Sequence, residues 1–437
     1  MKLNSLTMVN FRRFRELTVD FHPDLTVIAA RNGKGKTTVL EAAALALSPF
    51  VGAFDESRGE NIKKMDARFT GDQSRGQNEQ AFPVILDARF DNPEIHSIRE
   101  LRSGKGATTT GGSRALADYG KALQDAVRNY EDVDLPLVCY YSSKRLWVHH
   151  SKTSSRAPSK SRIAGYTDCL SALSSMNQLT QWVRKAELVD LQRQQNTQGE
   201  TAGRSPSLAG VSQAVADTLA DEGWSGFRYD FDLDSLSMHH PDHGRLPIHI
   251  MSDGIRAMTS LSADIARRAC QLNPQYGPDA PSLTSGIVLI DEVDLHLHPE
   301  WQQRVLDGLR RTFPHMQFVV STHSPQVLSS VSSANIRTID RDGEDAWSAT
   351  QPADEIKGLS SEVALSEVME VSPNPPVRET KVLNAYIELI EQGLADSEDG
   401  RQLRTELENT YGPEHRVIRD ADRRIRFQAL KAKRVAQ

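Results

Sequence analysis

Ala30-Arg31-Asn32-Gly33-Lys34-Gly35-Lys36-Thr37 is the stretch that decides the fold, because it joins an apolar run to a helical segment. The run, residues 25–29, predicts a buried strand, and the segment 37–47 predicts a helix that ends at Ser48-Pro49. Small residues in such a turn let backbone N–H groups curl around a phosphate, and the helix N-terminus adds a favourable dipole. The stretch therefore predicts a triphosphate-binding loop.

Individual residues of this loop have predicted roles. Lys36 is expected to reach the β- and γ-phosphate oxygens of ATP, and the Thr37 hydroxyl is expected to hold Mg²⁺. The predicted nucleotide contacts of the loop are Asn32, Gly33, Lys34, Gly35, Lys36, Thr37 and Thr38. Ala30 stands where the GxxxxGK[ST] pattern has its first glycine, and alanine fits there if its φ is negative. A glycine-rich turn without a ligand is the alternative interpretation.

A second candidate element is an apolar run, residues 287–290, that ends in two carboxylates. Asp291 is expected to bind Mg²⁺ through water, and Glu292 to polarise the water that attacks the γ-phosphate. The alternative is that the acids only cap the next loop. That alternative is common for a single acid and much rarer for a pair in a chain with a phosphate loop.

Three further elements follow the order that a nucleotide site needs. Residues 251–256 open an amphipathic helix, with Ser252 as its cap and Asp253 and Gly254 as further predicted contacts. Asp294 follows the acidic pair. His323 ends the next strand, and this position favours a catalytic role over a structural one.

The order of strands and helices predicts an α/β fold. Residues 3–9 and 17–21 alternate as half-buried strands, and from residue 281 a strand (287–290), a helix (299–313) and a strand (317–322) follow one another. Such alternation predicts a parallel, doubly wound sheet. Together with the phosphate loop, we expect a mixed, largely parallel sheet with flanking helices, as in the head of a P-loop ATPase.

We expect four segments along the chain. Residues 1–100 hold the first part of the head, 101–235 inserted loops and helices, 236–355 the second part of the head, and 356–437 a helical tail. Residues 102–114, 151–162 and 194–209 are rich in Gly, Ser, Thr and charge, and we expect mobile surface loops there. A helical segment is expected over 169–195. In the tail, helices are expected over 382–394 and 403–407, with an Arg- and Lys-rich stretch over 416–434.

Composition limits the classes of function. The net charge of −6 argues against attraction of the whole surface to nucleic acid or lipid, although a local basic patch stays open. Cys139, Cys169 and Cys270 lack metal-ligand spacing, and we expect buried thiols in a reducing compartment. The N-terminus does not resemble a signal peptide and no run of 18 apolar residues occurs, so we expect a cytoplasmic protein without a membrane partner.

The motif set NGKGKT, MSDGIR, VLIDEVDLHLHP and STHSP resembles the ABC-type ATPase heads of the RecF, SMC and OLD group. Further text is similar to the ATPase subunit, PtuA, of Septu and certain retron anti-phage systems. This text comprises FRRF (11–14), LPLVCYY (135–141) with KRLW (144–147), SADIARR (262–268) and THSPQVL (322–328). The resemblance covers roughly residues 1–370.

The resemblance implies a site shared between two protomers of a homodimer or larger oligomer. Ser252 of one chain would meet the γ-phosphate held by the other, His323 would be the γ-phosphate switch, and Asp294 would couple the two subunits. No residue matches the glutamine of the Q-loop. The resemblance also implies an HNH nuclease partner similar to PtuB. In a retron, a reverse transcriptase and an RNA–DNA hybrid are further candidate partners, and DNA is another.

The predicted function is that of an ATP-binding and hydrolysing regulatory subunit that controls a separate nuclease in an anti-phage complex. Only 114 residues follow His323, too few for the end of the head and the Toprim nuclease domain of OLD proteins, and no HNH or DxD cluster occurs. The main alternative is a RecF-like DNA-repair ATPase acting on DNA ends or gaps, although the inserts are too short for a coiled-coil arm. A transporter subunit is disfavoured by SDGIR in place of SGGQ, and a slow nucleotide-gated scaffold is the third alternative.

Overall fold

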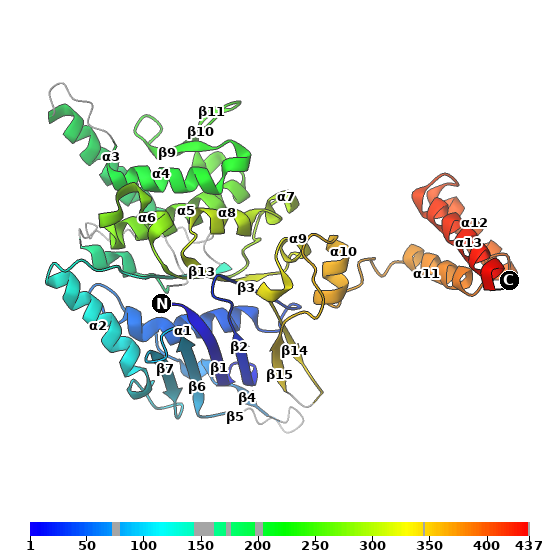
Figure 1. Ribbon diagram of the computed structural model, residues 1–437, viewed down its shortest axis with the longest axis horizontal. Coiled ribbons are helices and arrows are strands. Elements are labelled where there is room, and N and C mark those ends of the chain that lie inside the picture. Colours follow the sequence, from blue (N-terminus) through cyan, green and yellow to red (C-terminus); the bar gives the residue numbers. More distant parts are fainter. Residues whose placement is uncertain (72–78, 144–160, 172–175, 197–203, 344–345, 436–437) are drawn as a thin grey trace. The chain divides into compact units, whose positions relative to one another are not determined.

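The computed structural model in Figure 1 describes residues 1–71, 79–143, 161–171, 176–196, 204–343 and 346–435. The chain forms two compact units, Met1–Met369 and Glu370–Gln437. Residues 144–147 of the family resemblance and most of the basic loop 151–162 lie outside the described residues.

The centre of the first unit is a six-stranded sheet with the order β15-β14-β3-β13-β12-β8. All neighbours are parallel except β14 and β15. Every residue of β3, β8, β12 and β13 is buried, as expected for parallel strands that are covered on both faces. The prediction of a largely parallel α/β sheet is confirmed. The strands are β3 (Leu25–Ala29), β8 (Leu137–Tyr141), β12 (Gly286–Ile290), β13 (Met316–Thr322), β14 (Ile336–Arg341) and β15 (Trp347–Thr350).

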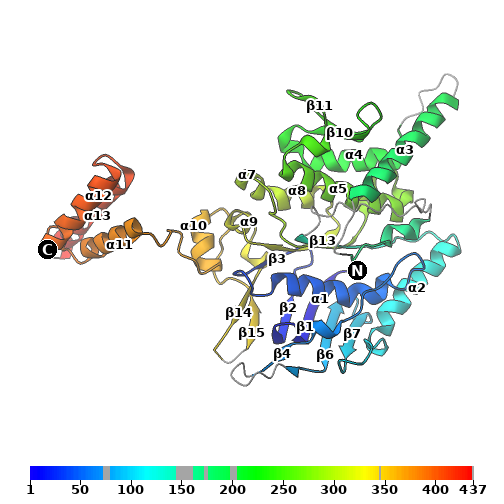
Figure 2. The same cartoon turned by 180° about the vertical axis from the view of Figure 1, so that it is seen from behind.

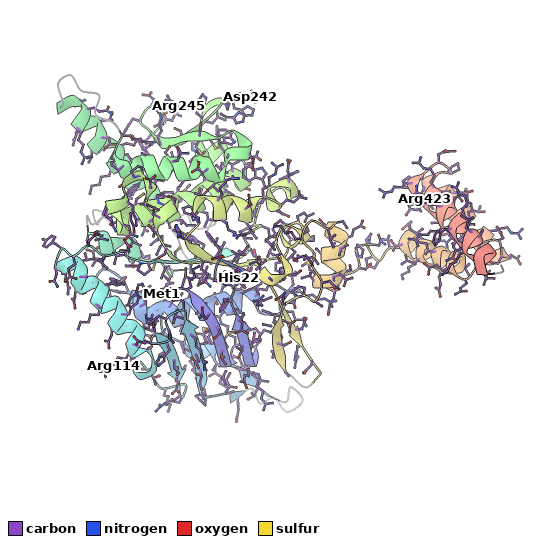
Figure 3. The ribbon with its side chains drawn as sticks, in the orientation of Figure 1. Met1, His22, Arg114, Asp242, Arg245 and Arg423 are labelled. Atoms are coloured by element: carbon purple, nitrogen blue, oxygen red, sulfur yellow. The ribbon has the colours of Figure 1, made fainter. Side chains whose placement is uncertain are left out.

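Smaller antiparallel sheets complete the first unit. One has the order β2-β1-β6-β7, and its strands alternate buried and exposed side chains because one face packs on the core. Another has the order β11-β10-β9, and Asp242 and Arg245 mark its outer edge in Figure 3. Their strands are β1 (Leu3–Phe11), β2 (Phe14–Asp20), β6 (Val84–Phe90), β7 (His96–Leu101), β9 (Ser225–Asp230), β10 (Ser235–His240) and β11 (Gly244–Pro247), and β4 (Phe69–Thr70) pairs with β5 (Glu79–Gln80).

Helices cover the central sheet. Figures 1 and 2 show α1 (Lys36–Val51) between the central sheet and the β1-β2-β6-β7 sheet, and α5 (Asp253–Leu272) on the other side. The remaining longer helices are α2 (Arg114–Arg128), α3 (Met176–Asn196), α4 (Pro206–Thr218) and α8 (Val305–Thr312). The short ones are α6 (Ala280–Leu283), α7 (Pro299–Gln302), α9 (Pro325–Ser329) and α10 (Ser361–Val363).

The prediction that α1 ends at Ser48-Pro49 is wrong, because the helix continues to Val51 with Pro49 inside it. Proline has no N–H to donate to the carbonyl four residues earlier, which is that of Leu45. In this fold the Arg99 side chain of β7 supplies the missing donor, and its Nη1 lies 2.6 Å from the Leu45 oxygen. A tertiary contact therefore satisfies the group that the proline leaves without a partner.

Other predicted boundaries also differ. The helix expected over 299–313 is divided into α7 and α8 by a turn at residues 303 and 304, where Arg304 has φ −114° in place of about −63°. The helix expected over 169–195 begins only at Met176 among the described residues. Two of the expected loops run into helices: α2 starts at Arg114, and α4 starts at Pro206, where proline occupies the first turn.

The second unit consists of α11 (Arg378–Glu391), α12 (Glu398–Tyr411) and α13 (Arg416–Val435), so the predicted helical tail is confirmed. Its small core contains Tyr386, Ile390, Leu407, Ile418 and Ala421. Arg423 extends from the surface of α13 (Figure 3).

Cys139, Cys169 and Cys270 are buried free thiols, as predicted. Within the described ranges, no helix has both the length and the apolar composition needed to cross a bilayer.

Candidate functional site

The parallel strands bring the predicted site residues to one edge of the central sheet. β13 lies between β3 and β12, and all three run in the same direction. The phosphate loop follows β3, Asp291 follows β12, and His323 follows β13. Loops at the carboxyl ends of parallel strands are the usual ligand-binding region of such sheets.

Two glycines shape the phosphate loop. Gly33 has φ 76° and Gly35 has φ 101°, both in the left-handed region that favours glycine. A Cβ atom on Gly35 would lie 2.5 Å from Cζ of Phe14, so this position has no space for a side chain. Ala30 is buried and is not among the residues with positive φ, so an alanine fits there without strain.

The Lys36 side chain is held inside the loop. Its Nζ donates to the Ala30 carbonyl at 2.7 Å and lies 3.2 Å from Nδ1 of His323. Burial lowers the Lys36 pKa to about 8, while Asp291 and Glu292 act in the opposite direction. A polyanionic ligand would stabilise the charged form of the Lys36 amine, because its negative charge offsets the unfavourable burial of the ammonium group.

Thr37 and Asp291 are in direct contact. The Thr37 hydroxyl donates to Oδ1 and Oδ2 of Asp291 at 3.1 and 3.0 Å. The Ser321 hydroxyl donates to Oδ1 of Asp291 at 2.6 Å and accepts from the Glu292 N–H at 2.8 Å. A hydroxyl and a carboxylate on two adjoining elements are oxygen ligands of the kind that Mg²⁺ prefers. Ser321 had no predicted role, although it opens the STHSP motif; its place on β13, next to β12, brings it to Asp291.

The residues after Asp291 take unusual positions. Glu292 is partly buried and has φ 50°, a left-handed backbone that is costly for a side-chain-bearing residue and is common at functional sites. Asp294 accepts a hydrogen bond from the Thr322 hydroxyl at 2.6 Å. Burial lowers the His323 pKa and Lys36 lowers it further, which favours the neutral imidazole at pH 7.

The predicted contact residues Ser252, Asp253 and Gly254 lie at the start of α5. Ser252 caps α5 as expected, and its hydroxyl accepts from the Ile255 N–H at 3.5 Å. Gly254 is buried, and a Cβ there would lie 3.0 Å from the His296 carbonyl oxygen. Ser252 and Asp253 are exposed, and their described bonds lie within this helix and its flanking turn. The phosphate-loop residues Asn32 and Gly33 are exposed as well.

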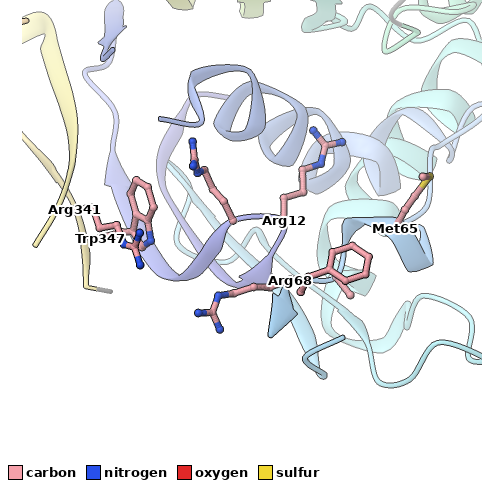
Figure 4. Close-up of a pocket in the computed structure, with 8 residues that line it drawn as sticks. Arg12, Met65, Arg68, Arg341 and Trp347 are labelled. Atoms are coloured by element: carbon pink, nitrogen blue, oxygen red, sulfur yellow. The ribbon is translucent and has the colours of Figure 1, made fainter. Parts of the chain in front are cut away.

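A cavity of about 420 Å³ lies beside the phosphate loop (Figure 4). Trp347 lies at one side of it, with the Arg13 guanidinium 5.0 Å and the Lys34 amine 6.0 Å from its ring centroid. A Cβ on Gly33 would be 3.8 Å from Nη1 of Arg13, which places the cavity next to the loop. The lining residues are Arg12, Arg13, Met65, Ala67, Arg68, Phe69, Arg341 and Trp347.

No functional motif in the sequence indicates this cavity. Arg13 belongs to FRRF, which contributed only to the family resemblance. Arg341 and Trp347 lie on the β14–β15 hairpin, which was not predicted from the sequence.

Comparisons with known proteins agree with the motifs. A family profile described as an AAA domain matches residues 5–202. The chain is 24% identical to the Retron Ec83 probable ATPase of Escherichia coli, over 96% of this chain and 85% of that protein. It is 22% identical to the Septu protein PtuA of Bacillus mycoides, over 83% of this chain and 44% of that protein. Among solved structures, the SMC head domain from Thermotoga maritima matches 80% of this chain and 99% of that chain, with a TM-score of 0.43 and 15% identity.

These comparisons confirm the resemblance predicted from the motifs: the chain contains a match to the AAA domain and is similar, over most of its length, to a probable retron ATPase and to the Septu protein PtuA.

Proposed function

We propose that this protein binds ATP with Mg²⁺ and hydrolyses it. The observation that carries the proposal is the contact between Thr37 and Asp291 beside the buried Lys36. A hydroxyl, a carboxylate and an amine converge at the edge of the sheet, next to a loop whose glycines leave its backbone N–H groups free to approach a phosphate.

Each side chain has a chemical task in this proposal. Lys36 binds the β- and γ-phosphate oxygens, and Thr37 and Asp291 hold Mg²⁺, which when bound neutralises charge on those oxygens. Glu292 orients and polarises the attacking water, and the neutral His323 donates a hydrogen bond to the γ-phosphate. Ser321 keeps Asp291 oriented through its 2.6 Å hydrogen bond.

The cavity beside the loop suits the base and ribose of the nucleotide. Its volume of about 420 Å³ falls in the range of small-molecule sites. Arg12 is neutralised by Glu41 and Asp66. Arg13 has no carboxylate partner among the described residues, and its Nη1 lies beside Gly33 of the loop, so it is the cation that we assign to the ligand.

We further propose that two protomers complete each site. Ser252 and Asp253 are exposed at the N-terminus of a 20-residue helix, where backbone N–H groups attract anions. An exposed helix start that is separate from the strand-end cluster is suited to contact a phosphate bound by another copy, with Asp294 as the coupling residue.

At the level of biology, we propose a cytoplasmic ATPase of an anti-phage system that controls a separate HNH nuclease, which docks on the helical unit 370–437. The similarity to a retron ATPase and to PtuA supports this proposal. Further candidate partners are a reverse transcriptase with an RNA–DNA hybrid, and DNA. The runner-up is a RecF-like repair ATPase, for which turnover would rise with gapped DNA and would not depend on a nuclease partner.

ATP binding and phosphate release by the purified protein test the proposal. Lys36→Ala should lose nucleotide affinity, because the amine that meets the phosphates is removed. Lys121→Ala, an exposed lysine on α2, is the matched control and should behave like the wild type. Equal ATP affinity of the two variants would exclude the phosphate-loop assignment.

A further inference from the structure

A buried carboxylate lies at the middle of α5. Asp264 is only 6% exposed, and its Oδ1 accepts from Nη2 and Nε of Arg267 at 2.6 and 3.0 Å. Its Oδ2 accepts from Nε of Arg268 at 2.8 Å and from the Tyr141 hydroxyl at 2.9 Å. Four donors therefore fix the orientation of this one carboxylate.

The charges of this network do not change near neutral pH. Burial acts to raise the pKa of Asp264, but Arg268 and Arg267 together hold it well below its usual range. Burial acts to lower the pKa of Arg268, but Asp264 raises it. Burial and Asp264 both raise the pKa of Tyr141. The network therefore keeps the same charges near neutral pH and does not act as a pH switch.

Stability alone does not account for such a network. Two guanidiniums and one carboxylate are removed from water, and well-packed apolar residues often stabilise an interior equally well. The informative property is what the network connects.

Tyr141 joins the network to the candidate site. It is the last residue of β8, and its carbonyl oxygen accepts from the Asp291 N–H at 2.8 Å, while its hydroxyl reaches Asp264. Arg268 extends the network by donating to the carbonyls of Gly165 and Thr167 at 2.8 and 3.0 Å. One tyrosine thus contacts the acidic strand end through its main chain and α5 through its side chain.

Ser252 caps the N-terminal end of α5. Twelve residues separate Ser252 from Asp264, which corresponds to about 18 Å of helix. Because a helix is stiff along its axis, a shift of α5 at Asp264 displaces Ser252 as well.

We propose that Tyr141, Asp264 and Arg268 are positioning residues that couple the acidic strand end of one protomer to the Ser252 helix that the same protomer offers to its partner. The inference rests on the proposed composite site. A rearrangement at Asp291 on ligand binding moves Tyr141, and α5 follows. The occupancy of one site thereby sets the placement of Ser252 in the other.

The test compares two tyrosines that are both almost fully buried. Tyr141→Phe removes only the hydroxyl that reaches Asp264, and Tyr166→Phe removes a hydroxyl that donates to the Pro136 carbonyl at 2.8 Å outside the network. We expect wild-type turnover to be cooperative in ATP. Tyr141→Phe should lower kcat about tenfold, the factor for one lost hydrogen bond to a charged group, leave ATP affinity unchanged and reduce the Hill coefficient to 1. Tyr166→Phe should change only the melting temperature.

If both variants lower the melting temperature and neither changes kcat or the Hill coefficient, the network is merely structural. Asp264→Asn is a second variant with the same expected kinetic pattern. If the wild type shows no ATP turnover, the proposed function fails, and sedimentation velocity then decides the coupling. In that case Tyr141→Phe should weaken ATP-dependent self-association about tenfold relative to Tyr166→Phe, and equal association of the two variants would overturn the inference.

Discussion

Thr37 and Asp291 are 254 positions apart in the sequence, yet the Thr37 hydroxyl lies 3.1 and 3.0 Å from the two carboxylate oxygens of Asp291. The contact exists because β3 and β12 lie on either side of β13 and end at the same edge of the sheet. The hydroxyl and the carboxylate therefore lie close enough together for one cation to bind between them.

Glu292→Gln should bind ATP with unchanged affinity and release phosphate at least 10²-fold more slowly, the usual contribution of a general base. The substitution keeps the size of the side chain, and the Glu292 N–H still donates to Ser321 because that bond involves only the main chain of residue 292. Glu300→Gln, an exposed carboxylate on α7, is the control. Wild-type turnover in the Glu292 variant would remove this residue from the water-activating role.

Mixing Ser252→Arg chains with Lys36→Ala chains should restore ATP turnover that each variant lacks alone. In a mixed dimer, one site combines an intact Lys36 with an intact Ser252, and the other site carries both defects. Random mixing should regain about one quarter of the wild-type sites, because half of the dimers are mixed and each has one working site. Turnover no higher than the sum of the separate variants would argue against a composite site.

Arg99→Leu should lower the free energy of unfolding by about 2–4 kcal/mol, because it removes charged hydrogen bonds, one of them to the buried Leu45 carbonyl. Nη1 of Arg99 donates hydrogen bonds to the carbonyls of Leu45 and Glu60, at 2.6 and 2.7 Å. Adding Pro49→Ala to Arg99→Leu should recover part of the loss, since the new N–H of residue 49 can donate to the Leu45 carbonyl. Urea unfolding of the four proteins gives the double-mutant cycle, and strictly additive effects would show that Arg99 and Pro49 are independent.

Deletion of residues 371–437 should leave nucleotide binding largely intact and abolish co-purification with the nuclease partner. The remaining chain corresponds to the first compact unit. A finer variant replaces the exposed Phe427 and Leu430 of α13 with glutamate, and Leu188→Glu on α3 is its exposed apolar control. Capture of the partner at full yield by the truncated protein would place docking elsewhere.

The sequence predicted the parts of the fold that local patterns encode. β3 matches its predicted bounds because a fully buried parallel strand is a continuous apolar run between turn residues. The β14–β15 hairpin was missed because its short strands alternate weakly and its second strand is largely exposed. The course of α1 depends on a contact between residues 45 and 99, which no local window contains.

The same distinction applies to the candidate site. Short motifs contain Lys36, Thr37, Asp291 and His323. In the structure Lys36 contacts His323, and Thr37 contacts Asp291. Trp347 lies outside every quoted motif, and Ser321 belongs to STHSP but had no predicted role. Their places beside Lys34 and Asp291 follow from the order of strands in the sheet, and a single sequence does not state that order.

The hydrogen bond from Arg99 to Leu45 has a consequence for the order of folding. The last turn of the helix that leads from the phosphate loop lacks one donor until a strand about fifty residues further along the chain has docked. During synthesis on the ribosome, a nascent chain that ends before residue 99 would lack the hydrogen bond from Arg99 to the Leu45 carbonyl of this helix. Until the β1-β2-β6-β7 sheet has docked, the Leu45 carbonyl would have to take its hydrogen bond from water.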